Sequence, residues 1–466
     1  MPVLPPPKGG FEITVPILII GAGACGLVAG MTAREAGAEV MVLERDAKPT
    51  GSSTLSTCLI PAAGTRLQKK EGVTDTPEKF AADLIAKAKN KNDPDMALWV
   101  AQESAPTVDW LMETVGMPLS LLTGFKYPGH SEFRMHGSPN RTGQELMAVL
   151  PAAAERMGVD VATSALVTDV YADESARVHG VQLTRPDGVT EDIGCDVLIL
   201  ACNGFGGNPE MLRQYIPEIA DAPYFGHVGN KGDAVKWGMA LGGAVKDMGG
   251  YQGHGAVAHP LGVPVMWGVL TEGGFQVNFK GERFSNETLG YSEQAMEVAR
   301  QPEGLAWDIF DHDAYVMASG FADFQHCIEM NAVKEGNTVE ELAKATNLPV
   351  EALRKTFAEV EGLSKGKGKD AWGRDFTQKP FLEPPFHAIK ITGALFHTQG
   401  GLVVDSHARV LRENGTPLPN LFAGGGAARG LSGPSRWGYL SGNGLLTATV
   451  LGRLAGRYAA KQVLGK

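Results

Sequence analysis

Apolar runs that end in glycine-rich turns divide the chain into segments typical of a parallel α/β sheet. Residues 13–20 form a branched apolar run that suits a buried parallel strand. The small and apolar residues that follow predict a helix, and residues 38–44 predict a second strand. Two further apolar runs, within residues 196–212 and 418–433, also lead into glycine turns. The pattern therefore predicts buried strands near both ends and in the middle of the chain.

The turn after the first strand has the spacing G-x-G-x-x-G, at Gly21, Gly23 and Gly26. The first glycine allows a tight turn, the second lets the backbone approach a pyrophosphate, and the third lets helix pack on strand. Free N–H groups at the start of the helix, around Ala24, favour negative charge. Glu44 follows after about 20 residues, where a carboxylate can hold a ribose hydroxyl. The unit predicts a dinucleotide site but does not separate FAD from NAD.

The composition of the chain favours a small molecule as its main binding partner. The 466 residues allow two or three domains, or one nucleotide-binding domain with a second domain inserted into it. The net charge of -10, without a Lys/Arg-rich run, argues against nucleic acid or an anionic membrane as the main partner. We expect no transmembrane segment, because no run reaches about 18 apolar residues. The five cysteines show no C-x-x-C pair, which favours reduced thiols without a metal, and we expect a cytoplasmic protein.

Three stretches downstream of the first motif decide for FAD: DVLILACNGFGGNPEML, GNKGDAVKWGMALGGAV and LPNLFAGGGAARGLSG. With that motif they resemble the flavoprotein family of fumarate reductases, succinate dehydrogenase flavoprotein subunits and 3-ketosteroid dehydrogenases. The resemblance implies an α/β fold with a Rossmann-like FAD-binding domain split in sequence, at 1–250 and 397–466. It also implies an inserted α+β capping domain at 251–396 that binds the substrate. No histidine lies in the GSSTLST segment, so we expect the FAD to be non-covalent.

The resemblance also implies which residues hold the cofactor. In the family, a helix such as SGNGLLTATVLGRLAG aims its N-terminus at the pyrimidine edge of the flavin, where N–H groups stabilise negative charge. We expect this helix to be capped by Ser441. The predicted cofactor-binding residues are Gly21, Gly23, Ala24, Gly26, Glu44, Ser52, Ser53, Thr54, Asn203, Gly204, Asp233, Gly425, Gly442 and Leu445.

The stretch AHPLGVPVMWGVLTEGGFQVNFKGERFSNETLGYSEQ resembles the substrate hairpin of soluble fumarate reductases. The resemblance implies that His259 and Thr271 contact the substrate. Four residues after Glu287, those enzymes carry the arginine that delivers a proton, and this chain has Tyr291. A second arginine of their proton path corresponds to Phe275. The ketosteroid dehydrogenases instead have a tyrosine at the position of Tyr291, and there it is the base that removes a proton.

The exchange of arginine for a phenol has a chemical meaning. A fumarate reductase must pair two carboxylates and supply a proton, which suits arginines. A dehydrogenase acting beside a ketone must remove a weakly acidic C–H proton in an apolar pocket. A phenol, with an unperturbed pKa of about 10, can do this if neighbouring groups stabilise its phenolate. Tyr291 is therefore predicted to be catalytic.

The carboxyl-terminal segment contains a third set of motifs that resemble this family. Some of these motifs resemble the fumarate reductases, and others resemble the ketosteroid dehydrogenases. HTQGG resembles a fumarate reductase motif in which the histidine, here His397, touches a substrate carboxylate. GPSRWGYLSGNG aligns in two ways, which place the second substrate arginine at Arg436 or at Tyr439. GYLSG resembles the Tyr-x-Ser-Gly of Δ4-type ketosteroid dehydrogenases, which implies catalytic roles for Tyr439 and Ser441. The Δ1-type motif is absent, and Gln399 stands where those enzymes have a lysine.

The main prediction is an FAD-dependent oxidoreductase that introduces or reduces a C=C bond beside the carbonyl of a neutral, cyclic, ketosteroid-like ketone or enone. Hydride would pass between substrate and flavin N5, with Tyr291 or Tyr439 moving the adjacent proton. The other tyrosine, Ser441 or an N–H near Gly442 would polarise the carbonyl. One alternative is a reductase of a small unsaturated carboxylate, held by Arg436, His259 and His397. Another is an electron-transfer subunit. The exact substrate, the direction and the electron acceptor or donor stay open.

Overall fold

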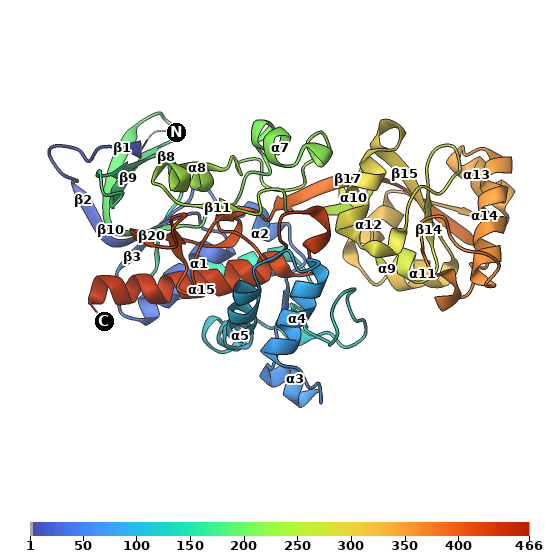
Figure 1. The fold of residues 1–466 in the computed structure, drawn as a ribbon, viewed down its shortest axis with the longest axis horizontal. Helices are drawn as coiled ribbons and strands as arrows, with labels where there is room; N and C mark the ends of the chain where they lie inside the picture. The colour runs from blue at the N-terminus through green and yellow to red at the C-terminus, as the bar shows by residue number, and fades with distance from the viewer. Residues whose placement is uncertain (1–2, 466) are drawn as a thin grey trace. The chain divides into compact units, whose positions relative to one another are not determined.

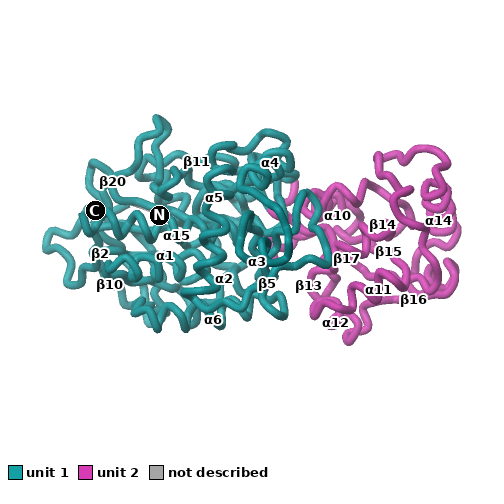
Figure 2. Tube along the Cα trace, turned by 90° about the horizontal axis from the view of Figure 1, so that it is seen from below, with its two compact units in different colours: residues 1–216, 226–251, 397–466 teal, residues 217–225, 252–396 magenta. Residues whose placement is uncertain are grey.

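The computed structural model describes residues 3–465, which divide into two compact units (Figures 1 and 2). Unit 1 comprises the described residues up to Ile216, Gly226–Tyr251 and the chain from His397 onward. Unit 2 comprises Pro217–Phe225 and Gln252–Phe396. The predicted divisions at 250/251 and 396/397 lie within one residue of two of these boundaries.

The segment Pro217–Phe225, which the predicted domain scheme left in the first domain, belongs to unit 2. Two backbone hydrogen bonds explain its place. Phe225 N–H donates to the carbonyl of Leu395 at 2.8 Å, and Leu395 N–H donates to the carbonyl of Pro223 at 2.9 Å. Such pairing between distant segments leaves no local signal in the sequence.

The main sheet of unit 1 has a parallel centre. β2 (Ile13–Ile20) pairs with β3 (Val40–Leu43) on one side and with β10 (Thr190–Leu200) on the other. Ile19, which is fully buried, faces Val42 in β3 and Ile199 in β10. β2 coincides with the predicted strand, and β3 lies inside the second one. The other strands of this sheet are β1 (Val3–Leu4), β7 (Asp160–Ala162), β8 (Leu166–Ala172), β9 (Val178–Thr184), β19 (Arg409–Leu411) and β20 (Pro417–Ala423).

Two long helices meet on this sheet. α1 (Ala24–Glu35) follows β2 directly, and α15 (Asn443–Leu464) packs along it, as Figure 1 shows with α15 in red. Glycines permit this close approach, because a Cβ on Gly452 would lie 2.5 Å from the Cys25 carbonyl oxygen. A Cβ on Gly456 would lie 2.2 Å from the carbonyl oxygen of Ala29. The packing brings the first segment of the chain against the last one.

The rest of unit 1 consists of smaller elements around these helices. The short strands β4, β5 and β6 form a three-stranded sheet, and β11 pairs with β18. Their bounds and those of the remaining helices are β4 (Leu59–Pro61), β5 (Ser120–Leu121), β6 (Met135–Gly137), β11 (Val245–Lys246), β18 (Gly401–Leu402), α2 (Gly51–Thr54), α3 (Arg66–Lys70), α4 (Pro77–Lys87), α5 (Pro94–Trp110), α6 (Gly143–Arg156), α7 (Pro209–Tyr215) and α8 (Asp233–Ala240).

Unit 2 is an α+β unit built on a six-stranded sheet of order β13-β12-β17-β15-β14, with β16 also paired to β17. The chain passes between the units within β12 and again within β17. The strands are β12 (Tyr251–Ala258), β13 (Val263–Pro264), β14 (Phe275–Val277), β15 (Leu305–Phe310), β16 (Val333–Gly336) and β17 (Phe386–Thr398). The helices are α9 (Gly268–Thr271), α10 (Tyr291–Ala299), α11 (His312–Ala318), α12 (Ala322–Glu329), α13 (Val339–Thr346) and α14 (Val350–Ser364).

Two features are absent from residues 3–465. None of their helices combines the length and apolar character that crossing a bilayer requires. The same residues contain no group of three His, Cys, Asp or Glu side chains placed to hold a metal ion.

Candidate active site

A cavity in unit 1 opens where β2, β3 and β10 end and α1 begins, with an empty volume of about 840 Å³ that includes space open to solvent. Nine predicted cofactor-binding residues line it: Gly21, Gly23, Ala24, Glu44, Ser52, Ser53, Asn203, Asp233 and Gly425. Five others lie outside its lining: Gly26, Thr54, Gly204, Gly442 and Leu445. Predicted residues from five separate segments, at 21–44, 52–53, 203, 233 and 425, therefore converge on one cavity.

The carboxylate of Glu44 is held at the start of the first turn. Its Oε2 accepts a hydrogen bond from Ala22 N–H at 2.9 Å, and its Oε1 accepts one from Asp46 N–H at 3.0 Å. Each carboxylate oxygen has a second acceptor position. Glu44 is thus oriented by backbone groups and keeps acceptor capacity for a ribose hydroxyl, which is its predicted role.

Two serines of α2 connect the cavity walls. Ser53 Oγ accepts a hydrogen bond from Ala24 N–H at 3.0 Å, at the N-terminus of α1. Ser52 Oγ accepts hydrogen bonds from His227 N–H at 3.2 Å and from Asn230 Nδ2 at 2.9 Å. His227 and Asn230 also line the cavity, and neither was predicted, although Asn230 lies within the stretch GNKGDAVKWGMALGGAV.

The residues around the cavity fit an FAD molecule. Gly21 has a φ of +104°, and a Cβ there would lie 2.7 Å from the carbonyl oxygen of Ala201. The turn therefore needs glycine, and it places Gly23 and Ala24, at the N-terminus of α1, in the wall of the cavity. Asn443, the first residue of α15, is fully buried, and neither atom of its amide has a hydrogen-bond partner among residues 3–465. A buried amide of this kind calls for an external polar partner.

The start of α15 differs from the prediction. The N-cap is Gly442, with a φ of +85°, and not Ser441. A side chain could not replace glycine there, because a Cβ would lie 2.5 Å from Cδ of Pro61. The backbone conformation imposed by this packing moves the helix start one residue beyond the serine, so the predicted capping role of Ser441 was wrong.

Tyr439 meets this helix start. Its buried phenolic oxygen accepts a hydrogen bond from Gly444 N–H at 3.4 Å. Burial raises the pKa of the Tyr439 phenol above its usual value, an effect that hydrogen bonds from the backbone N–H groups of Gly444 and Gly442 oppose. The ring of His397 lies edge-on to that of Tyr439, with centres 5.4 Å apart. Of the predicted site residues, Tyr439 and His397 are therefore neighbours.

His397 approaches the helix through Gly444. A Cβ on Gly444 would lie 2.8 Å from Nε2 of His397 and 3.6 Å from the oxygen of Tyr439. On its other side, Nδ1 of His397 lies 3.0 Å from Nε2 of Gln399, and Oε1 of Gln399 accepts a hydrogen bond from Ser432 Oγ at 2.8 Å. Loss of hydration lowers the pKa of His397 to about 4, so the imidazole is neutral above pH 5.

Ser441 and Arg436 lie on the same turn but have different surroundings. The carbonyl oxygen of Ser441 accepts a hydrogen bond from Nε2 of the buried His130 at 3.1 Å. The guanidinium of Arg436 lies over the ring of Trp437, 5.0 Å from its centre. Tyr439 contacts the N-terminus of α15 through the Gly444 N–H, and the choice between the two alignments stays a prediction.

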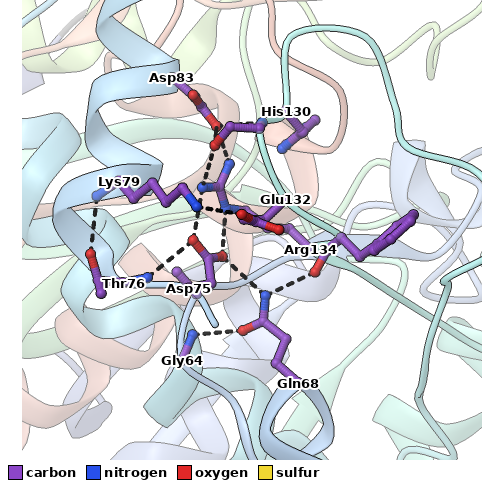
Figure 3. Close-up of polar contacts among 12 residues, drawn as sticks. Gly64, Gln68, Asp75, Thr76, Lys79, Asp83, His130, Glu132 and Arg134 are labelled. Carbon is purple, nitrogen blue, oxygen red and sulfur yellow. Dashed lines mark hydrogen bonds and ion pairs between the residues drawn. The ribbon is translucent and has the colours of Figure 1, made fainter. Parts of the chain in front are cut away.

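His130 belongs to a segment held by a buried ion cluster (Figure 3). Arg134 donates two hydrogen bonds to Asp75, from Nε at 2.7 Å and from Nη2 at 2.9 Å, and it also pairs with Asp83. Its guanidinium lies 4.7 Å from the centre of the Phe80 ring. Burial lowers the pKa of His130 to about 4, and the nearby Arg134 charge acts in the same direction. The cluster thus supports a neutral histidine that holds the Ser441 carbonyl, a role that no motif in the sequence revealed.

In unit 2, Tyr291 is the first residue of α10, and it stacks on a histidine that sequence reasoning missed. The ring of His254 stacks on the rings of Tyr291 and Phe396, with ring centres 5.1 Å and 5.5 Å apart and ring planes inclined by 20° and 19°. Trp267 stands edge-on to both His254 and Tyr291. Burial lowers the pKa of His254 to about 4, and its Nδ1 accepts a hydrogen bond from Ala256 N–H at 3.2 Å. The neutral ring therefore carries its proton on Nε2.

The other two predicted substrate residues of unit 2 lie outside this aromatic group. His259 is exposed in the turn that follows β12. Thr271 is the last residue of α9 and its hydroxyl bonds to the carbonyl of Gly268 at 3.4 Å. Their contact with a substrate stays a prediction.

Comparison with known proteins agrees with this geometry. The family model described as FAD binding domain matches residues 16–445. A probable fumarate reductase of Shewanella frigidimarina is 31% identical over 462 residues, which cover 98% of this chain and 76% of the relative. The 4-oxocyclohex-2-ene-1-carboxylate 5-dehydrogenase of Sinomonas cyclohexanicum is 29% identical over 360 residues, covering 68% of this chain and 60% of that enzyme.

A solved structure shows the same fold. The open conformation of a flavocytochrome c3 fumarate reductase aligns with a TM-score of 0.84 and 29% identity, covering 98% of this chain and 80% of that one. The predicted family, fold class and cofactor are confirmed. The chain belongs to the FAD-binding flavoprotein family that includes the fumarate reductases, and it is an FAD-dependent oxidoreductase acting on CH–CH groups.

Proposed function

We propose that this protein introduces or reduces a C=C bond beside the carbonyl of a neutral, cyclic, ketosteroid-like ketone or enone. The observation that carries the proposal is the phenol of Tyr439, whose oxygen accepts the Gly444 N–H at the start of α15 beside His397. These groups are uncharged, and they offer hydrogen bonds suited to a carbonyl oxygen. A carboxylate substrate would favour a cation at this position.

The two tyrosines suit different tasks. Burial raises the pKa of Tyr439 and keeps it protonated, so its hydroxyl can donate a hydrogen bond to the carbonyl and make the adjacent C–H more acidic. Tyr291 would then accept or return the proton, as its position after Asn286-Glu287 suggests. Ser441 is the alternative to Tyr439 for polarising the substrate carbonyl. Bound FAD, held non-covalently by the cavity of unit 1, supplies hydride exchange with a substrate carbon.

The relative from Sinomonas cyclohexanicum supports this reading. That enzyme is named as a dehydrogenase of a ring that carries a ketone, a double bond and a carboxylate. A substrate of that kind would use the same carbonyl chemistry and would also give Arg436 an anion to bind. A ring ketone with a carboxylate is therefore the first compound to add to a panel of neutral ketones.

A second candidate is a reductase of a small unsaturated carboxylate, with Arg436, His259 and His397 as anchors. The observation in its favour is the 31% identity to a probable fumarate reductase along nearly the whole chain. Against it stand Tyr291 and Phe275, where that chemistry has arginines. In either case the physiological electron donor or acceptor is a separate partner.

One experiment separates the two candidates. The oxidised holoenzyme is mixed anaerobically with 3-oxo-5α-steroids, cyclohexanone, 4-oxocyclohex-2-ene-1-carboxylate and succinate, each alone, and the loss of visible flavin absorbance is followed. We expect reduction by a ketone, and we expect Tyr291→Phe and Tyr439→Phe to abolish it. Tyr458→Phe, in the last part of α15 against His407, is the matched control and should behave like the parent protein.

Two outcomes of this experiment would contradict the ketone proposal. Reduction by succinate that survives Tyr291→Phe and is lost in Arg436→Ala would overturn the ketone proposal in favour of the carboxylate one. Reduction by no member of the panel, in a protein that carries its full complement of FAD, would contradict both substrate classes.

A further inference from the structure

Gln399 makes a contact that the predicted chemistry does not use. Its side chain lies between His397 and Ser432, with Nε2 3.0 Å from Nδ1 of His397 and Oε1 2.8 Å from Ser432 Oγ. Gln399 is 5% exposed and Ser432 is 1% exposed, so water does not compete for these hydrogen bonds. Gly430 provides the space, since a Cβ there would lie 2.6 Å from Oε1 of Gln399.

The amide of Gln399 decides where His397 carries its proton. An amide nitrogen only donates, so Nδ1 of a neutral imidazole facing it must be the acceptor, and the proton must be on Nε2. The Thr398 carbonyl oxygen lies farther from Nδ1, at 3.4 Å, and would favour the other tautomer. In the arrangement present, the Ser432 hydroxyl donates to Oε1 of Gln399, and the amide nitrogen is directed at the histidine at the shorter distance of 3.0 Å.

We propose that Gln399 is a positioning and specificity-determining residue that fixes His397 as a neutral donor through Nε2, and thereby selects an uncharged carbonyl oxygen over a carboxylate. Nε2 lies on the side of Gly444, where the Tyr439 oxygen and the first N–H groups of α15 also lie. The site then presents hydrogen-bond donors without a full positive charge. This proposal rests on the proposed function for its substrate, but the tautomer of His397 can be measured without one.

The substitution Gln399→Glu should reverse the preference for a proton on Nε2 of His397. A carboxylate only accepts, so the single proton of a neutral His397 would move to Nδ1 and Nε2 would lose its donor. The nearby negative charge would also raise the pKa of the imidazole and favour the imidazolium, which donates from both nitrogens. The variant should therefore keep ketone activity at low pH and lose it as the pH rises above the new pKa of His397. It should also accept carboxylate substrates better while His397 is charged.

The substitution Gln399→Met removes the hydrogen bond at similar size. We expect kcat for the ketone to fall about 10-fold to 100-fold, the range typical for residues that orient a catalytic ligand, with a smaller change in KM. Gln325→Met is the matched control, since Gln325 donates to Ser319 on an exposed part of unit 2. FAD content and melting temperature are measured for every variant, so that loss of folding is recognised.

The deciding measurement is the ¹⁵N NMR spectrum of His397 in the FAD-loaded enzyme, assigned with His397→Gln and recorded from pH 5 to pH 9. We expect a proton on Nε2 throughout in the parent protein and on Nδ1 at high pH in Gln399→Glu. A parent protein with its proton on Nδ1, or a Gln399→Glu variant with the same tautomer and the same pH profile, would overturn the inference. If no ketone is a substrate but the tautomers are as expected, the proposed function fails and the positioning role of Gln399 stands.

Discussion

The imidazole of His254 lies flat against the phenol of Tyr291, with ring centres 5.1 Å apart and planes within 20°. The ring of Phe396 also stacks on the imidazole, with ring centres 5.5 Å apart. The three rings form a stack that fixes the direction of Tyr291 at the start of α10. The phenol is therefore positioned by aromatic packing in addition to the backbone of its helix.

This stack predicts different effects for two substitutions. His254→Phe keeps a flat ring but removes the acceptor of the Ala256 N–H, so activity should stay near the parent value while the unfolding free energy falls by about 1 kcal/mol. His254→Ala removes it, and we expect a loss of about 1–3 kcal/mol in unfolding free energy together with a fall in kcat. Urea unfolding and steady-state kinetics check both. If His254→Phe were as inactive as His254→Ala, the imidazole would have a polar role that stacking does not explain.

The pKa of His254, lowered to about 4 by burial, adds a second expectation. Above pH 5 the ring is neutral in the folded protein, so its ionisation should contribute no limb to the pH–rate profile between pH 5.5 and pH 9. A limb in that range that disappeared in His254→Phe would contradict the neutral state.

We expect the substitution Gly444→Ala to reduce activity while the protein still folds. A Cβ on this residue would lie 2.8 Å from Nε2 of His397, so Gly444→Ala must displace the histidine. Misplacement of a reacting group by about 1 Å can cost up to about 10²-fold in rate, and we expect a fall of that order with FAD still bound. The control is Gly362→Ala in α14, where the nearest atom is 4.0 Å away. That variant should be slightly more stable and fully active.

Asp308 predicts how the stability of the protein depends on pH. Its side chain is fully buried on β15, Gln276 Nε2 donates to its Oδ1 at 2.8 Å, and burial raises its pKa to about 8. Between about pH 4 and pH 8 the folded protein holds this proton and the unfolded chain does not. Stability therefore falls as the pH rises through this range, by at most about 1.4 kcal/mol per pH unit from this group.

Asp308→Asn should remove that slope, because the amide stays neutral at every pH. Denaturant unfolding at pH 5, 6, 7 and 8 should show the variant gaining stability relative to the parent as the pH rises. A constant difference between the two proteins over this range would mean that Asp308 ionises normally in the fold.

The ion cluster of Arg134 leads us to expect a large effect of one substitution on stability. Asp75→Asn leaves a fully buried guanidinium without its bidentate partner, and we expect a loss of about 3–5 kcal/mol. The control is Glu340→Gln, which breaks the exposed pair with Arg354 and should leave the unfolding midpoint almost unchanged. Calorimetry of both variants tests the comparison, and a midpoint for Asp75→Asn as high as that of the control would contradict it.

The part of the fold that sequence patterns predicted is the part encoded locally. The strand Ile13–Ile20 and the glycine turn at Gly21 have the predicted places, because apolar runs and positive φ are properties of neighbouring residues. The site was predicted less completely. His254 and His130 act through contacts with residues more than thirty positions away, which no periodicity records. The start of α15 at Gly442 depends on packing against Pro61, again a distant residue.

The two points at which the inserted part of unit 2 leaves and re-enters unit 1 adjoin each other. Gln399 N–H donates to the carbonyl oxygen of Gly250 at 2.8 Å, so both ends are tied together within unit 1. An insertion with adjacent ends can change in length or sequence without altering the path of the chain through the host. The path of unit 1, whose cavity fits FAD, can thus stay constant while the sequence of Gln252–Phe396, which carries Tyr291 and His254, changes.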